Sequence, residues 1–169
     1  MKLGVKVLAP AVLLAILATI ILPAAYAEPM DTPGSFYRVT STSGYALMKV
    51  GGEVVRVDAS LTATVEVLTV WENVTVFAVV DGQLKIGDNT YDIARGWWIG
   101  LYYKPSGRAL YEGLARNDEG GVGFILHSRD ITEADGATTM RIIGAFKEKI
   151  GNSTTPGRIF LEAIRVKIS

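Results

Sequence analysis

The sequence predicts an all-β protein, and three observations carry this prediction. Apolar and polar residues alternate with a period of two in many short stretches after Phe36, as they do in strands with one buried face. Glycine-rich turn signals separate these stretches, and no stretch keeps a helical period for three turns. Short links make neighbouring strands antiparallel, so we expect a meander that closes into an up-and-down β-barrel, with a two-sheet β-sandwich as the alternative.

The alternation predicts roughly ten strands, some of them assembled from shorter segments. The segments, by residue number, are 36–41, 45–50, 53–58, 61–67, 74–80, 84–86, 91–93, 96–104, 108–116, 122–127, 138–147 and 158–168.

Turns are predicted where glycine and small polar residues gather. Gly51-Gly52 is a two-residue hairpin signal, Asp81-Gly82 predicts another turn, and Asn117–Gly121 predicts a hairpin loop. The longest loop is expected over Ser128–Ala137. Glycines within strands, such as Gly100, fit the bends that barrel closure requires.

The N-terminus has the order of a secretory signal peptide, which we expect to be helical. Lys2 and Lys6 form a basic start, Val7–Leu22 is an apolar run, and Ala25–Ala27 supplies small residues before Glu28. We therefore predict cleavage between Ala27 and Glu28 and a secreted or cell-surface location.

Two other readings of this segment stay open. An uncleaved segment 1–27 would tether the protein to the membrane, although its apolar run is a few residues shorter than a spanning helix needs. A pilin-type leader cut near Gly4 is the third reading. After cleavage at Ala27, residues 28–35 are expected to form a flexible lead-in and residues 36–169 a single domain.

Composition excludes several function classes. The chain has no cysteine, which removes thiolate catalysis, sulfur-based zinc sites and lipoprotein anchoring. Loss of residues 1–27 leaves 15 basic and 17 acidic residues, a formal charge of −2, so a basic nucleic-acid surface is not expected. The cysteine-free composition also suits a thermophilic source.

Two sequons make the protein a candidate glycoprotein. They begin at Asn73 and Asn152, and Asn152 lies in an expected loop.

An aromatic cluster supplies the main candidate contact site. Alternation places Trp97 and Tyr103 on one face of a strand and Trp98 and Tyr102 on the other. One pair should pack in the core and the other should face solvent, a ligand such as a glycan, or a partner. The glycines beside Trp98 leave open that its ring is the outward one.

A cluster of three acidic residues is the candidate metal site. Asp130, Glu133 and Asp135 lie in the expected long loop, where oxygen ligands could hold Ca²⁺, although an ordinary solvated loop has the same composition. His127, the single histidine, is expected at a strand end without a catalytic role.

Glu162 is expected on the same face as Phe160 and Ile164. If that face were interior, Glu162 would need a buried partner such as an arginine. A bulge between Leu161 and Ala163 would instead turn Glu162 towards water.

These features predict a non-enzymatic envelope or extracellular domain that binds a ligand, a glycan or a partner, or that has a structural role. The first alternative is a pilus-like subunit that assembles with its own copies by strand addition, with residues 28–35 and the strand after them as donor. The second alternative is a hydrolase using paired acids, Asp118 with Glu119 or Asp130 with Glu133.

Overall fold

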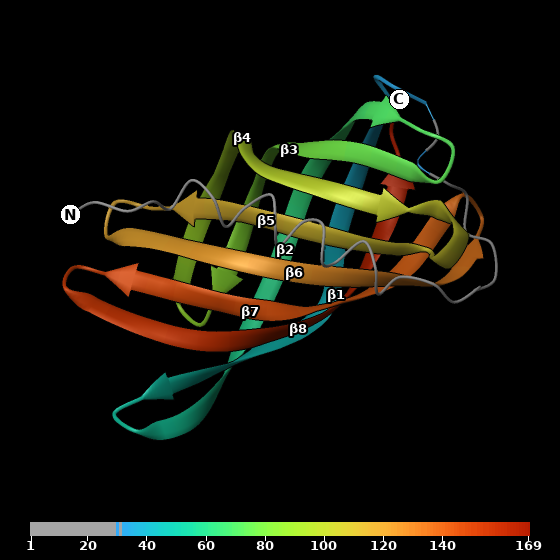
Figure 1. Cartoon of the computed structure of the whole chain (residues 1–169). Helices are drawn as coiled ribbons and strands as arrows, with labels where there is room; N and C mark the ends of the chain where they lie inside the picture. Colours follow the sequence, from blue (N-terminus) through green and yellow to red (C-terminus); the bar gives the residue numbers. More distant parts are fainter. Residues whose placement is uncertain (1–29, 31) are drawn as a thin grey trace.

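The computed structural model describes Met30 and residues 32–169, which form a closed barrel of eight antiparallel strands (Figure 1). Each strand pairs with the next along the chain, and the last strand pairs with the first. The all-β prediction and the up-and-down barrel are confirmed, and the sandwich alternative is not. The predicted signal peptide and its cleavage site at Ala27 and Glu28 lie outside the described residues.

The strands follow one another with short links. They are β1 (Phe36–Val50), β2 (Glu53–Val70), β3 (Val74–Ile86), β4 (Asn89–Tyr103), β5 (Arg108–Arg116), β6 (Gly120–Ala134), β7 (Ala137–Ile150) and β8 (Ser153–Lys167), with a 3₁₀ turn, η1 (Lys104–Ser106), between β4 and β5.

Eight long strands replace the expected ten because several predicted breaks are bulges. The turn expected at Asp81-Gly82 is a register shift within β3, where the pairing with β4 slips between Val79 and Asp81. A similar shift in β1 lies between Thr40 and Tyr45. Bulges bend and twist a strand without ending it, so small polar residues at a bulge resemble a turn in the sequence.

The prediction of a long loop over Ser128–Ala137 is wrong. Strand β6 continues to Ala134, and β7 starts at Ala137 after a turn of two residues. Asp135 and Gly136 in this turn both have positive φ, 54° and 74°, as a tight hairpin requires. The prediction failed because acidic residues are common in solvated loops and also occur here at an exposed strand end.

Apolar side chains fill the barrel. The alternation predicted for Leu61, Ala63 and Val65 is correct, and all three face the interior. The largest interior side chains are Trp98, Tyr91, Tyr102, Phe77, Leu84, Ile86, Leu126, Met140, Ile142, Ile159 and Leu161. An eight-stranded barrel has an interior of about the size that side chains alone can fill.

The β1–β2 hairpin extends beyond the barrel wall and is visible as the projecting pair of strands in Figure 1. Pairing between β2 and β3 begins only at Ala59 and Ile86, and pairing between β1 and β8 reaches only as far as Met48 and Gly157. The predicted Gly51-Gly52 turn lies at the tip of this hairpin.

The described part of the lead-in is held against one end of the barrel. Met30 is buried, and its carbonyl accepts a hydrogen bond from the Thr75 hydroxyl. The Gly34 amide donates to the Val67 carbonyl, 2.8 Å away. In the described residues we find no helix with the length and apolar character needed to cross a membrane.

Candidate functional site

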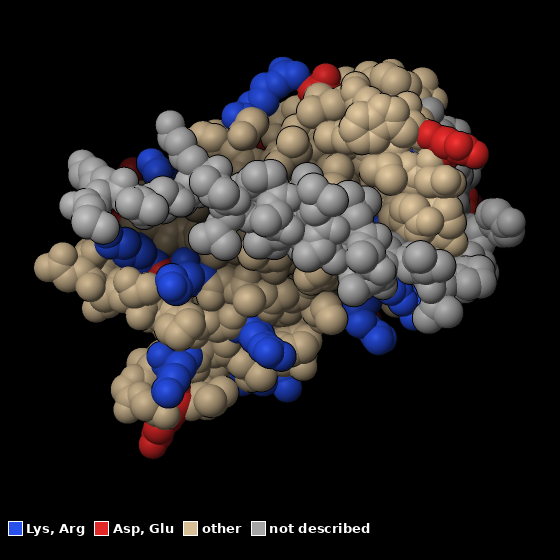
Figure 2. Space-filling model, viewed as in Figure 1, with Lys and Arg blue, Asp and Glu red and all other residues tan. Residues whose placement is uncertain are grey.

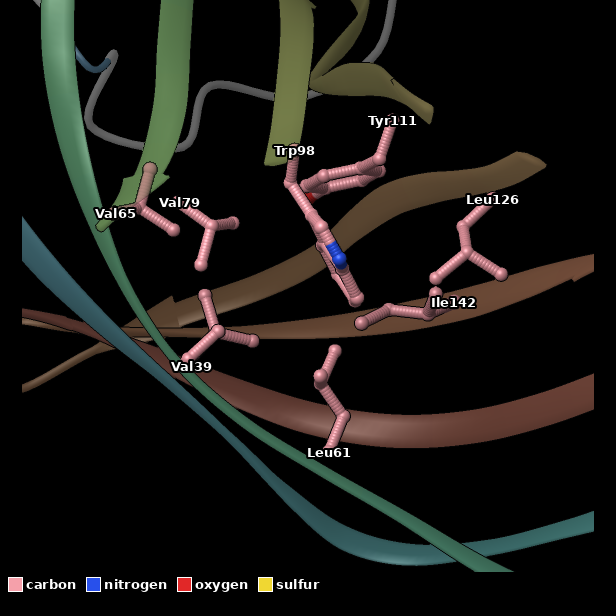
Figure 3. Close-up of a pocket in the computed structure, with 9 residues that line it drawn as sticks. Val39, Leu61, Val65, Val79, Trp98, Tyr111, Leu126 and Ile142 are labelled. Atoms are coloured by element: carbon pink, nitrogen blue, oxygen red, sulfur yellow. The ribbon is translucent and has the colours of Figure 1, made fainter. Parts of the chain in front are cut away.

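The barrel interior leaves no room for a ligand between the residues of Figure 3. The void there measures about 10 Å³, and its lining is apolar: Val39, Leu61, Ala63, Val65, Val79, Trp98, Tyr111, Leu126 and Ile142. A single water molecule needs a cavity of about this size together with polar partners. A ligand larger than water therefore does not fit between these nine side chains as they are packed.

The two aromatic pairs lie on opposite sides of the β4 wall. Trp98 and Tyr102 are interior, each 1% exposed, and the Trp98 indole N–H donates to the Leu114 carbonyl at 2.9 Å. This excludes an outward Trp98 ring and removes both residues from any outer contact surface. Trp97 and Tyr103 point outward, and Trp97 is 40% exposed.

A buried ion pair lies near one end of the interior. Arg165 from β8 and Asp130 from β6 approach to 3.0 Å, and the side chain of each is 3% exposed. The Tyr102 hydroxyl donates to the Asp130 carboxylate at 2.8 Å, and Arg165 also contacts Thr138. Because each charge has hydrogen-bond partners, this pair is a satisfied structural network.

Burial acts against both charges of the pair. It raises the pKa of Asp130 despite the opposing effect of Arg165. Burial alone would lower the pKa of Arg165, but the Asp130 carboxylate together with the neighbouring Tyr102 and Tyr111 outweighs this effect and leaves that pKa raised. The neighbouring phenols are also affected: burial raises the pKa of Tyr102, and it raises that of Tyr111 to about 12.

A second buried polar group lies elsewhere in the interior. The Tyr91 hydroxyl donates to the Glu148 carboxylate, which also accepts a hydrogen bond from Asn89 at 3.2 Å. Burial, followed by the nearby Glu148, raises the pKa of Tyr91. Both buried groups link different strands through hydrogen bonds inside the barrel, which is a structural contribution.

An open groove of about 580 Å³ lies instead across one end of β5, β6 and β7, and the β5–β6 turn with Asp118 and Glu119 and the β7–β8 turn with Gly151 also line it. Gly121 and Gly123 of β6 form its floor, because both glycines occupy outward positions and have no side chain. Leu114 lies on the β5 side and Lys147 on the β7 side. Strand spacing sets the distance between these two walls at roughly 10 Å.

Trp97 adjoins this groove. The Arg116 guanidinium, which lines the groove, lies 5.2 Å from the centre of the Trp97 ring. Leu114 is 48% exposed on the same wall. We call this set of residues, Trp97, Leu114, Arg116 and the glycine floor, the outer groove. Uncharged side chains make up most of the face in Figure 2, with basic and acidic groups scattered over it.

The groove has the chemistry of a site for a flat polar ring. A glycine floor lets a ligand approach the backbone closely, and an aromatic ring beside it offers a stacking surface. Lys147, Lys149 and Asn117 supply hydrogen-bonding groups along its edges. The volume falls within the range of small-ligand sites.

The candidate calcium residues are separated by the barrel wall. Asp130 points inward to Arg165, whereas Glu133 and Asp135 are exposed. Among the described residues, no group of three His, Asp or Glu side chains is placed to hold a metal ion. Calcium binding stays a prediction, and a site that used Asp130 would compete with the Arg165 guanidinium for its carboxylate.

Glu162 is exposed, but for a different reason from the expected bulge. The face it shares with Phe160 and Ile164 is the outer one, and Leu161 and Ala163 point inward. Glu162 lies 3.7 Å from Arg141, and both side chains are exposed. The buried charge of β8 is instead Arg165.

The remaining predicted sites are on the surface. His127 points outward from the middle of β6, opposite Leu110, rather than standing at a strand end. Asn73 and Asn152 are exposed in turns, as glycosylation requires, although whether they are modified stays a prediction. Asp118 and Glu119 are exposed in the β5–β6 turn. In this turn the side-chain oxygen of Asn117 accepts hydrogen bonds from the backbone amides of Glu119 and Gly120.

Sequence reasoning missed the glycine floor. The sequence pattern predicts a hairpin loop over Asn117–Gly121 and interprets glycines within strands only as sites of bending. A signal was present, because Gly121 and Gly123 alternate with the interior residues Val122 and Phe124. The period of two therefore places both glycines on the outer wall, but which residues flank them depends on the pairing with β5 and β7.

Comparison of the chain with protein-family models, curated proteins and solved structures gave no match. Its class therefore rests on its own geometry, which is that of an eight-stranded up-and-down β-barrel with a filled interior and a groove on its outer wall.

Proposed function

We propose that the protein is an exported, non-enzymatic binding domain that holds a glycan in the outer groove. The observation that carries this proposal is the glycine-floored groove beside Trp97, outside an interior whose described void is about 10 Å³. Sugar rings have apolar faces that stack on tryptophan and hydroxyl groups that suit lysine, arginine and asparagine. Export brings the domain to the compartment where envelope glycans are found.

Filling the groove tests this proposal. At Gly123, an added Cβ would meet only the Leu114 side chain, at 3.4 Å, so Gly123→Val is expected to fold. Valine also favours strands, so stability should rise by up to about 1 kcal/mol while glycan binding falls. Ala145→Val, on the exposed wall outside the groove lining, is the matched control. The measurement is affinity electrophoresis of the exported protein through gels containing individual polysaccharides.

A tryptophan exchange provides a second arm. Trp97→Ala should weaken retention by roughly tenfold, about 1.4 kcal/mol, whereas Trp71→Ala, at an exposed tryptophan in the β2–β3 turn, should not. Equal retention of the wild type, Gly123→Val and Trp97→Ala on every polysaccharide that binds would remove the groove as the site.

Self-assembly is the second candidate function, and the projecting hairpin favours it. Strand β1 pairs with β2 and β8 of its own chain, so its use as a donor strand would require the barrel to open. The open edge is instead residues 53–57 of β2, which extend beyond the start of β3 pairing and expose Val54. An unpaired strand edge is a template for another strand.

Electron microscopy of native surface material tests this second candidate. Filaments that disappear in a Val54→Lys variant would support assembly through the β2 edge. A protein that remains monomeric in sedimentation experiments at high concentration would count against it.

A further inference from the structure

Three arginines stand side by side on the outer wall, one on each of β5, β6 and β7. Arg108 is paired with Arg129, and Arg129 is paired with Arg141. Neighbours of the three along each strand, including Ala109 and Met140, are buried, so the arginines point outward. We call these three residues the arginine row.

Within the part of the chain that the structure describes, cross-strand pairing places three arginines and one acidic residue in this row. Like charges directly opposite one another across strands are destabilising. The acid in line with them is Glu162, paired with Arg141 at the β8 end of the row, 3.7 Å away and exposed. Exposed ion pairs of this kind contribute little to the free energy of folding. Arg129, in the middle, has an arginine across from it on both sides.

The spacing of the row suits an extended anion. Neighbouring strands lie about 4.8 Å apart, so the row spans roughly 10 Å from β5 to β7. Each guanidinium presents a planar set of donors that matches the oxygens of carboxylate or sulfate groups. Tyr103, half-buried on the outer wall, is paired with Arg108 and continues the row onto β4. An aromatic ring next to guanidinium groups favours an acidic sugar over an isolated inorganic ion, because the sugar ring can stack on it.

We propose that the arginine row binds the acidic groups of an anionic polysaccharide lying across β5, β6 and β7. This site is separate from the outer groove, since Arg108 and Leu114 are six residues apart on β5, or roughly 20 Å. Nucleic acid fits less well, because it requires a broad Lys/Arg field and the chain after residue 27 has a formal charge of −2.

The experiment compares the exported protein on immobilised polygalacturonate, dextran sulfate and neutral dextran, over a series of salt concentrations. The test variant is Arg108→Gln, Arg129→Gln and Arg141→Gln combined. The control combines Lys49→Gln, Lys85→Gln and Arg158→Gln, which removes the same charge from scattered exposed positions. Gly123→Val is included to report separately on the outer groove. Carboxylated and sulfated polymers distinguish the two possible acidic groups.

We expect the wild type to bind at least one anionic polymer at low salt and to ignore neutral dextran. The arginine-row variant should bind roughly tenfold more weakly with a shallower salt dependence, while the control and Gly123→Val should keep most of the affinity. Equal losses in the row variant and the control would overturn the proposal, since only net charge would then matter. Failure of the wild type to bind either anionic polymer at low salt would overturn it as well. A lower melting temperature in the row variant alone would also contradict the proposal, because the arginines would then stabilise the fold and the weaker binding would follow from partial unfolding.

Discussion

At the scale of single residues, the Asp130–Arg165 pair shows that the place of a charged residue in the fold decides whether it is buried or on the surface. Asp130 and Arg165 are far apart in the sequence, and each looks like an ordinary surface charge there. The barrel brings them to 3.0 Å, out of contact with water. Removing one partner of such a pair leaves an uncompensated buried charge, whereas removing both does not.

Asp130→Asn should therefore destabilise the barrel by about 3–5 kcal/mol, because the buried Arg165 guanidinium loses the carboxylate charge that lies 3.0 Å from it. The double variant Asp130→Leu with Arg165→Met should lose much less than the sum of the two single changes. Urea denaturation of the single and double variants measures this difference. A loss under about 1 kcal/mol for Asp130→Asn would show that the pair is not energetically coupled.

The buried tyrosines predict a loss of stability in alkali. An unfolded tyrosine has a pKa of about 10, and burial raises that of Tyr111 to about 12, so the folded state holds its proton more tightly. Stability from this phenol is complete below pH 10 and is lost as the pH rises towards 12, by about 2–3 kcal/mol. The melting temperature should fall across that window, and less so in Tyr111→Phe. A constant melting temperature between these pH values would contradict the assignment.

At the scale of elements, the face of the strand on which a glycine lies decides whether a larger residue could replace it. At Gly144 of β7, an added Cβ would meet the Ile125 carbonyl oxygen at 2.2 Å, which is backbone that cannot move aside cheaply. At Gly123 of β6, the first contact is the tip of a side chain at 3.4 Å. The sequence records two glycines in strands, and only the pairing of the strands distinguishes them.

Gly144→Ala should accordingly destabilise the protein by about 1–3 kcal/mol through overpacking. Gly123→Ala should stabilise it by about 0.5–1 kcal/mol, because alanine restricts the unfolded chain and fits the native backbone. Thermal unfolding of the two variants provides the comparison. Shifts of the same sign would mean that the environments of these two glycines do not differ as described.

At the scale of the whole molecule, closure depends on the first and last strands. Tyr37 of β1 pairs with Lys167 of β8, across nearly the whole described chain. Bringing such distant segments together costs chain entropy before their contacts can compensate. Without cysteine, no disulfide assists this step.

The barrel should therefore fold slowly, on a scale of milliseconds to seconds, as is usual for folds dominated by distant strand pairs. Stopped-flow refolding followed by tryptophan fluorescence tests this expectation, because Trp98 becomes buried only in the closed interior. Complete burial within microseconds would contradict the dependence on closure.

The sequence by itself determined the all-β class and the antiparallel meander, because a period of two and glycine turns are local properties. It also led to the proposals of export and of contact through an aromatic surface. Only the tertiary structure decided that Trp98 faces inward and Trp97 outward, that Asp130 meets Arg165, and that Gly121 and Gly123 form a groove floor. The period of two indicates which residues share a face, but which face is interior and which residues lie across from it depend on register and closure, which are set by residues distant in the chain.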